Sequence, residues 1–233
     1  MNKVLEIGCG QGFFSSVLAK KKNTTVVGID LSKSDIEVAK GRYPQIDFKY
    51  MNAEKLKFQD KSFNEVYALD VLEHVDNLEK VVSEVSRVLK KGGIFHINVP
   101  AEKSEKWLIS IRPTYFKEIH HVRVFVGNQM EDTLKKYNLI LQKKTNRDFL
   151  QHLELYYLFT RKSASKSQLS IGDWRATWVS KSIHLGMLYF DPVVLTTPLK
   201  FFPFWLVTLP IGYLVNLFGN KIFPKSVYYE FKK

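Results

Sequence analysis

The sequence is poor in cysteine and contains no long uninterrupted hydrophobic run. Cys9 is the only cysteine among 233 residues, so an internal disulfide is excluded, and we expect a reducing, cytoplasmic compartment. The first residues, MNKVLEIGCG, lack the apolar core and small-residue cleavage site of a secretory signal. No low-complexity tract indicates disorder, and 45% of the residues are hydrophobic, which is enough to bury a sizeable core. The chain is therefore expected to fold around a single core.

Acidic residues are also few relative to basic ones. The chain has 35 Lys and Arg against 23 Asp and Glu, a formal net charge of +12. Such a surface favours acidic partners, either nucleic acid or anionic lipid headgroups. Charge alone does not choose between them, and most of the excess is scattered lysine typical of a solvated surface.

Apolar segments typical of buried strands alternate with helical segments along the first 145 residues. We expect strands at 3–8, 25–30, 46–51, 65–70, 93–99 and 138–145, and helices at 12–22, 32–43, 76–89 and 128–137. Ser32 is the expected N-cap of the second helix, and the run LKKGG after the third indicates a helix stop with Gly near the C-cap. Alternating strands and helices predict a parallel sheet.

A glycine-rich turn joins the first strand to the first helix. Gly8, Gly10 and Gly12 follow Glu6 at alternate positions, and glycine allows a backbone to turn tightly and to approach a ligand closely. Asp30 ends the second strand, where a carboxylate can accept hydrogen bonds from both ribose hydroxyls of an adenosine. The third glycine comes two residues after the second, so the dinucleotide-binding spacing is not met.

At this point the chain resembles the class I S-adenosylmethionine-dependent methyltransferases, in particular their type 11 small-molecule group. The similarity lies in VLEIGCGQG, VVGIDLS, NAE at 52–54, ALDVLEHVDN at 68–77, LKKGGIFHINVP at 89–100 and HVRVF at 121–125. These motifs cover about residues 3–145 in the expected order.

The resemblance implies S-adenosylmethionine as the cofactor and implies no metal. By analogy with the family, the methionine end is held by Glu6 and the turn of Gly8, Cys9, Gly10 and Gly12, the ribose by Asp30, and the adenine by Leu31, Asn52 and Ala53. Asp70, at the tip of the fourth strand, would lie beside the methyl donor.

The resemblance also implies an α/β fold with a doubly wound, mostly parallel seven-stranded sheet whose last strand is antiparallel. We expect this strand at Val227 to Lys232, with residues 1–146 forming the methyltransferase core, 147–225 an apolar helical insertion and 226–233 the end of the sheet. A competing assignment puts the last strand at 153–160 and leaves the apolar stretch as an appendage.

The apolar stretch lies between Leu199 and Phe218. Residues 201–220 contain no charge, a length that just suffices for a membrane span. Two prolines and two glycines interrupt it, which favours broken helices at the membrane interface, or a buried lid over the substrate, over a straight span. We therefore expect either peripheral contact with the inner face of a membrane or a lid.

Three histidines are candidate catalytic bases, because imidazole titrates near neutral pH. His74, His120 and His121 all fall on loops expected near the carboxyl edge of the sheet. His74 is more typical of a packing residue at a helix entry, so we favour His120 or His121. Methyl transfer needs a base only where the acceptor must lose a proton.

The leading hypothesis is methyl transfer to oxygen or carbon of a small or lipid-linked acceptor. A nucleic-acid methyltransferase is the enzymatic alternative, disfavoured because Asp70-Val71-Leu72-Glu73 follows the fourth strand where base-flipping amino-methyltransferases carry an aromatic-flanked proline. A non-catalytic protein that kept the fold as a membrane scaffold is the alternative of a different class.

Overall fold

The computed structural model describes residues 1–147, 149, 214 and 217–233. The chain divides into two compact units. The first comprises residues 1–100, 121–145 and 228–233, and the second comprises 101–120 and 146–227. Most of the expected insertion, including nearly all of residues 199–218 and the competing strand at 153–160, lies outside the described residues. The expected domain bounds therefore stay a prediction.

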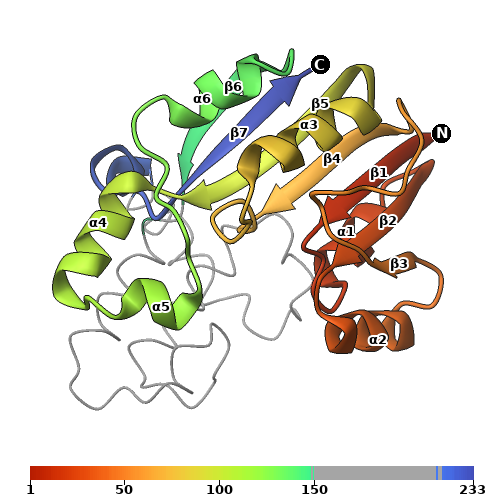
Figure 1. Ribbon diagram of the computed structural model, residues 1–233, viewed down its shortest axis with the longest axis horizontal. Helices are drawn as coiled ribbons and strands as arrows, with labels where there is room; N and C mark the ends of the chain where they lie inside the picture. The colour runs from red at the N-terminus through yellow and green to blue at the C-terminus, as the bar shows by residue number, and fades with distance from the viewer. Residues whose placement is uncertain (148, 150–213, 215–216) are drawn as a thin grey trace. The chain divides into compact units, whose positions relative to one another are not determined.

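The first unit is built on a seven-stranded sheet with the strand order β3-β2-β1-β4-β5-β7-β6 (Figure 1). The strands are β1 (Asn2–Ile7), β2 (Thr24–Asp30), β3 (Asp47–Tyr50), β4 (Phe63–Leu69), β5 (Leu89–Pro100), β6 (Ile140–Arg147) and β7 (Ser226–Lys232). β1 pairs in parallel with β2 and β4, and β2–β3 and β4–β5 are parallel as well. The predicted mostly parallel sheet is confirmed.

The last strand, β7, runs opposite to its neighbour β5 (Figure 1). Main-chain bonds from Gly92 N to Lys233 O (2.8 Å) and from Lys233 N to Gly93 O (3.0 Å) join the end of the chain to β5. Tyr228 adds a side-chain bond, 2.6 Å from its hydroxyl to Nδ1 of His96. The sequence expectation of an antiparallel strand at the C-terminal end agrees with these contacts.

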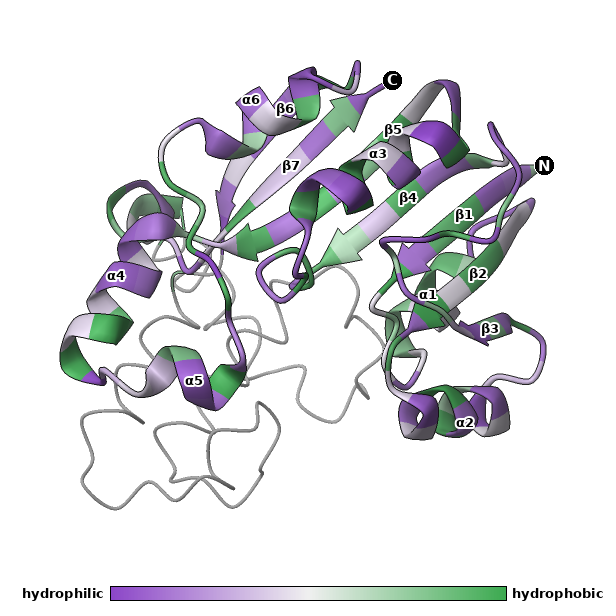
Figure 2. Cartoon of the chain, in the orientation of Figure 1, coloured by the Kyte–Doolittle hydropathy of each residue, from purple (hydrophilic) through white to green (hydrophobic). Residues whose placement is uncertain are grey.

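The sheet is covered by helices whose apolar residues follow helical spacing. α1 (Phe13–Ala19) and α2 (Lys33–Arg42) contribute Leu18, Ile36 and Ala39 to one core cluster. α3 (Leu78–Val88) buries a stripe of its own, Leu78, Val81, Val82, Val85 and Val88. Colouring by hydropathy shows β4 and β5 largely apolar and the edge strand β6 largely polar (Figure 2), as expected where the middle of a parallel sheet is buried on both faces.

Two helix ends differ from the sequence expectations. α3 ends at Val88, and Leu89 is already extended (φ −70°, ψ 138°) as the first residue of β5. The helix therefore stops within one residue of the predicted end, but the run LKKGG begins a strand, and the prediction of a glycine near the C-cap was wrong. α1 ends at Ala19, and the lysines after it form a turn. α2 follows its N-cap as expected, with Ser32 Oγ accepting from Asp35 N at 3.2 Å.

The described part of the second unit contains two helices that the sequence did not predict. α4 (Glu102–Ile111) and α5 (Tyr115–Ile119) pack Leu108 against Tyr115, with Trp107 and Phe116 beside them. The chain then returns to the first unit, where α6 (Gln129–Lys135) lies within the predicted helix at 128–137. No helix among the described residues is both long enough and apolar enough to span a bilayer.

Candidate active site

The carboxyl ends of β1, β2 and β4 carry most of the residues singled out from the sequence. Directly after β1 the chain turns sharply, with Gly8 N and Cys9 N both donating to Ile29 O of β2, at 2.8 and 3.0 Å. Gly8, Gly10 and Gly12 have φ values of 72°, 47° and 82°, the left-handed region in which only glycine is unstrained. The backbone geometry therefore explains the spacing of the three glycines.

The surroundings of the three glycines differ. A side-chain carbon on Gly8 would lie 2.3 Å from Cγ2 of Val71, and one on Gly12 would lie 2.6 Å from Cζ of Phe48. Gly8 and Gly12 are therefore required by protein packing. Around Gly10 no atom of the described residues lies within 4 Å of such a carbon, so in this part of the chain the turn is open to a ligand.

Asp30 connects this turn to the start of α2. One of its carboxylate oxygens accepts from Gly10 N and the other accepts from Ser32 N, both at 2.8 Å. Bonds from backbone amides to a carboxylate are charge-assisted and strong. Asp30 therefore holds Gly10 in place, a role that the sequence did not reveal, and it remains half-buried beside the open turn.

Glu6 lies beneath the turn with 5% of its surface exposed. Ser15 Oγ donates to one of its oxygens. The pKa of the Glu6 carboxyl is raised from its usual 4.5 to about 8, chiefly by burial. The hydrogen bonds from Ser15 lower this pKa and the nearby charge of Asp30 raises it. Burial likewise raises the pKa of the Cys9 thiol, so Cys9 acts in this structure as a small, unreactive packing residue.

The residues assigned to the adenine lie on the loops after β2 and β3. Leu31 follows Asp30 and is 62% exposed. Met51 N donates to Asp30 O at 3.0 Å, which brings the start of the next loop to the same edge. Asn52 there caps its own turn by accepting from Glu54 N at 2.8 Å, and Ala53 is buried.

Asp70 follows β4 with a φ of 54°. Its neighbour in the sheet, Asn98 of β5, holds it twice: Asp70 N donates to Asn98 O, and Asn98 Nδ2 donates to Asp70 Oδ1, both at 2.9 Å. A left-handed residue other than glycine costs on the order of 1 kcal/mol. The two hydrogen bonds with Asn98 offset this cost and fix the position of the Asp70 carboxylate.

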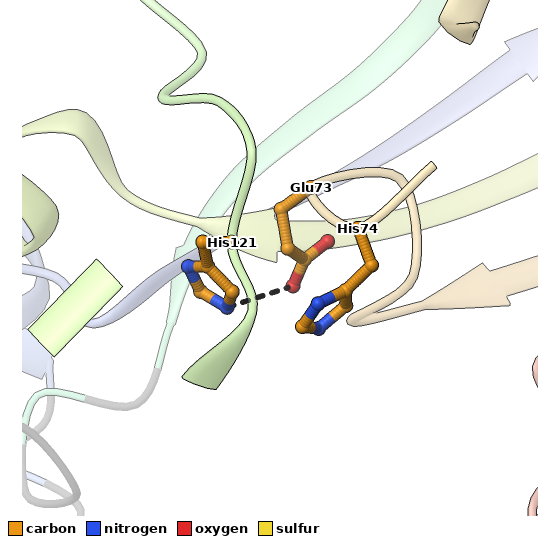
Figure 3. Close-up of side chains that lie close together, drawn as sticks. All are labelled: Glu73, His74 and His121. Atoms are coloured by element: carbon orange, nitrogen blue, oxygen red, sulfur yellow. Dashed lines mark ion pairs between the residues drawn. The ribbon is translucent and has the colours of Figure 1, made fainter. Parts of the chain in front are cut away.

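Two of the three candidate histidines come together with a buried carboxylate (Figure 3). His121 Nε2 lies 4.0 Å from Oε1 of Glu73, whose side chain is 1% exposed. The rings of His74 and His121 meet edge to face with centroids 4.7 Å apart. Glu73 was missed as a site residue, because its partner is remote in sequence and VLEHV gives no local sign of burial.

His120 differs from its neighbour. It has a φ of 60° as the C-cap of α5, belongs to the second unit and is exposed. The structure therefore brings His74 and His121 together, while His120 belongs to the other unit.

Glu73, His74 and His121 also form a set able to bind a metal ion. Each offers one ligand atom, and these atoms lie within 4.8 Å of one another. Imidazole nitrogen and carboxylate oxygen suit several divalent cations. The sequence expectation that no metal is used stays a prediction.

The sheet order, the glycine turn after β1 and the carboxylate at the end of β2 agree with the class I S-adenosylmethionine-dependent methyltransferase fold that the sequence resembles. Residues 5–97 match the family model described as a methyltransferase domain.

Named relatives come from several branches of the family. The chain is 33% identical over 158 residues to a ubiquinone biosynthesis O-methyltransferase of Pelagibacter ubique, covering 63% of this chain and 65% of that protein. It is 32% identical over 117 residues to a demethylmenaquinone methyltransferase of Chlorobaculum tepidum, covering 50% and 48%. The fold is similar to that of a geranyl diphosphate C-methyltransferase of Streptomyces coelicolor (TM-score 0.63, 12% identity, 100% and 73% covered).

The chain thus covers about two thirds of the first of these relatives and about half of the second. The matched region of the family model ends within β5.

Proposed function

We propose that the protein transfers a methyl group from S-adenosylmethionine to oxygen or carbon of a small or lipid-linked acceptor. The observation that carries this proposal is the open turn at Gly10, held by Asp30 at the carboxyl edge of the sheet. Ligands of doubly wound folds bind at this edge, where neighbouring strands send their connections to opposite faces. S-adenosylmethionine supplies an electrophilic methyl group on its sulfonium.

The residues around the turn fit such a ligand. Gly10 permits close approach of the backbone, Asp30 has a carboxylate for the ribose hydroxyls, and the exposed Leu31 offers an apolar surface for the adenine. Glu6, beneath the turn, is assigned to the methionine end by the resemblance, and a positive ammonium group beside it would favour its ionised form over the protonated form that burial favours. These assignments follow the family resemblance, and the open space over Gly10 is what supports them in this chain.

For an acceptor hydroxyl, His121 is the base that we propose. With Nε2 directed at Glu73, the other ring nitrogen, Nδ1, is the one that takes the hydroxyl proton. The Glu73 carboxylate then stabilises the imidazolium that forms, and the acceptor oxygen is left as the nucleophile. Burial of Glu73 strengthens this electrostatic effect, because water is excluded from around the charge.

The names of the relatives support the acceptor class. A ubiquinone biosynthesis O-methyltransferase and a demethylmenaquinone methyltransferase both point to quinone-type acceptors. A lipid-linked acceptor also agrees with the apolar residues 199–218, which we propose contact the acceptor or a membrane surface. That segment lies outside the described residues apart from 214, 217 and 218.

Calorimetry with S-adenosylhomocysteine, followed by transfer of labelled methyl from S-adenosylmethionine to phenolic and quinol acceptors, tests the proposal. We expect binding and methylation of at least one acceptor. His121→Gln should lower turnover by about 100-fold, the range of a general base, and a larger loss from His120→Gln would reassign the base. Absence of cofactor binding in the wild type would refute the proposal.

Two outcomes would favour the other hypotheses. Cofactor binding with no transfer to any small acceptor or lipid extract would point to a non-catalytic scaffold. Transfer to RNA or DNA alone would point to a nucleic-acid methyltransferase, which the net charge of +12 keeps in consideration.

A further inference from the structure

The two halves of the candidate catalytic cluster lie on segments far apart in the sequence. Glu73 and His74 belong to the loop at 70–77, between β4 and α3, whereas His121 belongs to the segment at 121–125, before α6. Neither segment is part of a regular element. The approach of His121 to Glu73 therefore depends on contacts that hold the segments against each other.

Three hydrogen bonds make this connection. Val122 N donates to Glu73 O at 2.9 Å. Arg123 Nη1 donates to Leu72 O at 2.7 Å, and its Nη2 donates to Asp76 O at 3.0 Å. The guanidinium thus bridges two carbonyls on either side of Glu73 and His74, and it comes from the residue two positions after His121.

We propose that Arg123 is a positioning residue that clamps the loop at 70–77 to the segment at 121–125 and thereby holds His121 against Glu73. This inference rests on the proposed function for its catalytic consequence, but the clamp itself is independent of that function. In this proposal Arg123 contacts neither the cofactor nor the acceptor.

The guanidinium of Arg123 suits this clamping role better than another positive side chain would. Arg123 is partly buried, and burial lowers the pKa of its guanidinium, an effect opposed by the charges of Asp76, Glu54 and Glu73. The carboxylates that favour the charged guanidinium come from the loop at 70–77, as Asp76 and Glu73, and from the loop after β3, as Glu54. Lysine would bring a single point charge and could not bridge two separate carbonyls with a planar fork.

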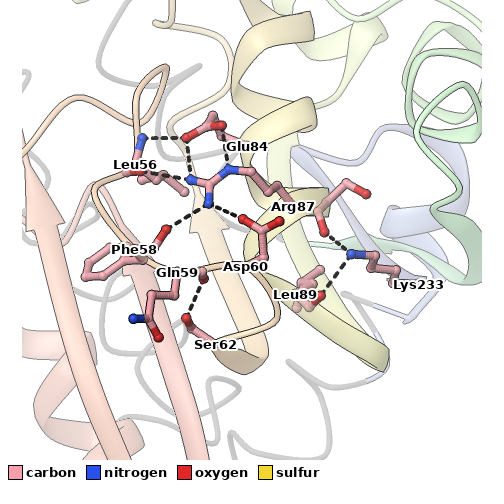
Figure 4. Close-up of polar contacts among 10 residues, drawn as sticks. Leu56, Phe58, Gln59, Asp60, Ser62, Glu84, Arg87, Leu89 and Lys233 are labelled. Carbon is pink, nitrogen blue, oxygen red and sulfur yellow. Dashed lines mark hydrogen bonds and ion pairs between the residues drawn. The ribbon is translucent and has the colours of Figure 1, made fainter.

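Arg87 provides a matched control elsewhere in the first unit (Figure 4). Its Nη1 donates to Phe58 O at 2.8 Å and its Nη2 donates to Leu56 O at 2.9 Å, so it too anchors a loop through carbonyls. It also pairs with Glu84 and Asp60. The loop that Arg87 anchors, residues 51–62, carries none of the candidate catalytic residues, but it does carry Asn52 and Ala53, which the resemblance assigns to the adenine. Arg87→Ala is therefore a control for hydrogen exchange at Val122 and for the catalytic cluster, and not for cofactor affinity.

The test compares the full chain with Arg123→Lys, Arg123→Ala and Arg87→Ala. Removing the hydrogen bonds that a charged group donates should raise the population of the open loop by about tenfold or more. We expect Arg123→Ala to speed hydrogen exchange at the Val122 amide by at least about tenfold, and Arg123→Lys to do so less. Arg87→Ala should instead speed exchange at the Leu56 amide, which donates to Glu84, and leave Val122 unchanged.

Activity gives a second readout. Arg123→Ala should lower turnover by about tenfold or more. It should leave the affinity for S-adenosylhomocysteine within about twofold, since Asp30 and Gly10 are not among its partners and Asp70, at the start of the clamped loop, is held separately by Asn98. Guanidinium at about 50 mM, far below denaturing concentrations, should restore part of this turnover but none of that lost in His121→Gln.

The two readouts separate the clamp from the proposed function. If the wild type binds no cofactor, the function fails while the exchange experiment still tests the clamp. The clamp is refuted if Arg123→Ala leaves exchange at Val122 unchanged, or if Arg87→Ala alters it equally. Should Arg123→Ala not fold, the same comparison is made with Arg123→Lys, for which wild-type exchange and turnover would overturn the proposal.

Discussion

Replacement of Asp30 by asparagine is the most informative change in the cofactor half of the site. Each oxygen of Asp30 accepts one backbone amide, from Gly10 and from Ser32. Asparagine keeps one acceptor oxygen, and its NH₂ group must then face an N–H donor. One charge-assisted bond is lost, which costs about 2 kcal/mol, and the melting temperature should fall by about 4–8 °C for a chain of this length.

Affinity should fall together with stability. In this variant Gly10 is no longer fixed, and the edge of the sheet has no carboxylate for the ribose. We therefore expect the affinity for S-adenosylhomocysteine, measured by calorimetry, to fall at least tenfold, about 1.4 kcal/mol. Asp35→Asn is the control, because Asp35 is half-buried like Asp30 but its carboxylate accepts, among the described residues, a side-chain bond from Gln11 at 3.1 Å and no backbone amide. If Asp30→Asn melts and binds like the wild type, the dual role of this carboxylate is refuted.

Two further predictions concern the residues around this turn. Gly10→Ala should weaken cofactor binding and lower the free energy of unfolding by about 1–2 kcal/mol, because alanine is strained in the left-handed backbone conformation. Gly8→Ala should instead unfold the domain, because the added carbon clashes with Val71. Equal cofactor binding by Gly10→Ala and the wild type would show that no ligand approaches Gly10. The free energy of unfolding should fall as pH rises from about 4.5 to about 8, because folded Glu6 keeps a proton that the unfolded chain releases in this window. Chemical denaturation across that range should show a flatter dependence for Glu6→Gln, and an unchanged slope would contradict the burial of a protonated Glu6.

The backbone geometry of the glycine turn and of the end of β2 was predictable because its signals are local, whereas the ligand contacts assigned to these residues stay predictions. Gly8, Gly10 and Gly12 lie within one turn, and Asp30 with the N-cap Ser32 marks the next strand end and helix start. Each signal depends on backbone conformation or capping within a few residues, which sequence reports directly. The structure adds that Asp30 fixes Gly10, a contact between two predicted residues that spacing alone does not show.

The remainder was harder because it depends on tertiary contacts. Helical spacing assigned Leu89 to α3, yet Leu89 already pairs with Phe63 across the sheet, so strand pairing overrides the helical pattern. α4 and α5 lie where the sequence has no repeated strand–helix pattern. Glu73 is an acidic residue in a short loop, and only its approach to His121 and its burial distinguish it.

The two halves of the site meet because β1 pairs with β4, although their sequences are far apart. In that pairing Ile7 lies beside Ala68, so the glycine turn that leaves β1 and the loop that leaves β4 begin side by side. The Val71 side chain fills the place where a side chain on Gly8 would stand. Gly8 therefore lets the loop carrying Glu73 and His74 pack directly on the cofactor turn. The Val71 side chain therefore stands at the junction between the turn that we propose holds the cofactor and the loop that carries two of the candidate catalytic residues.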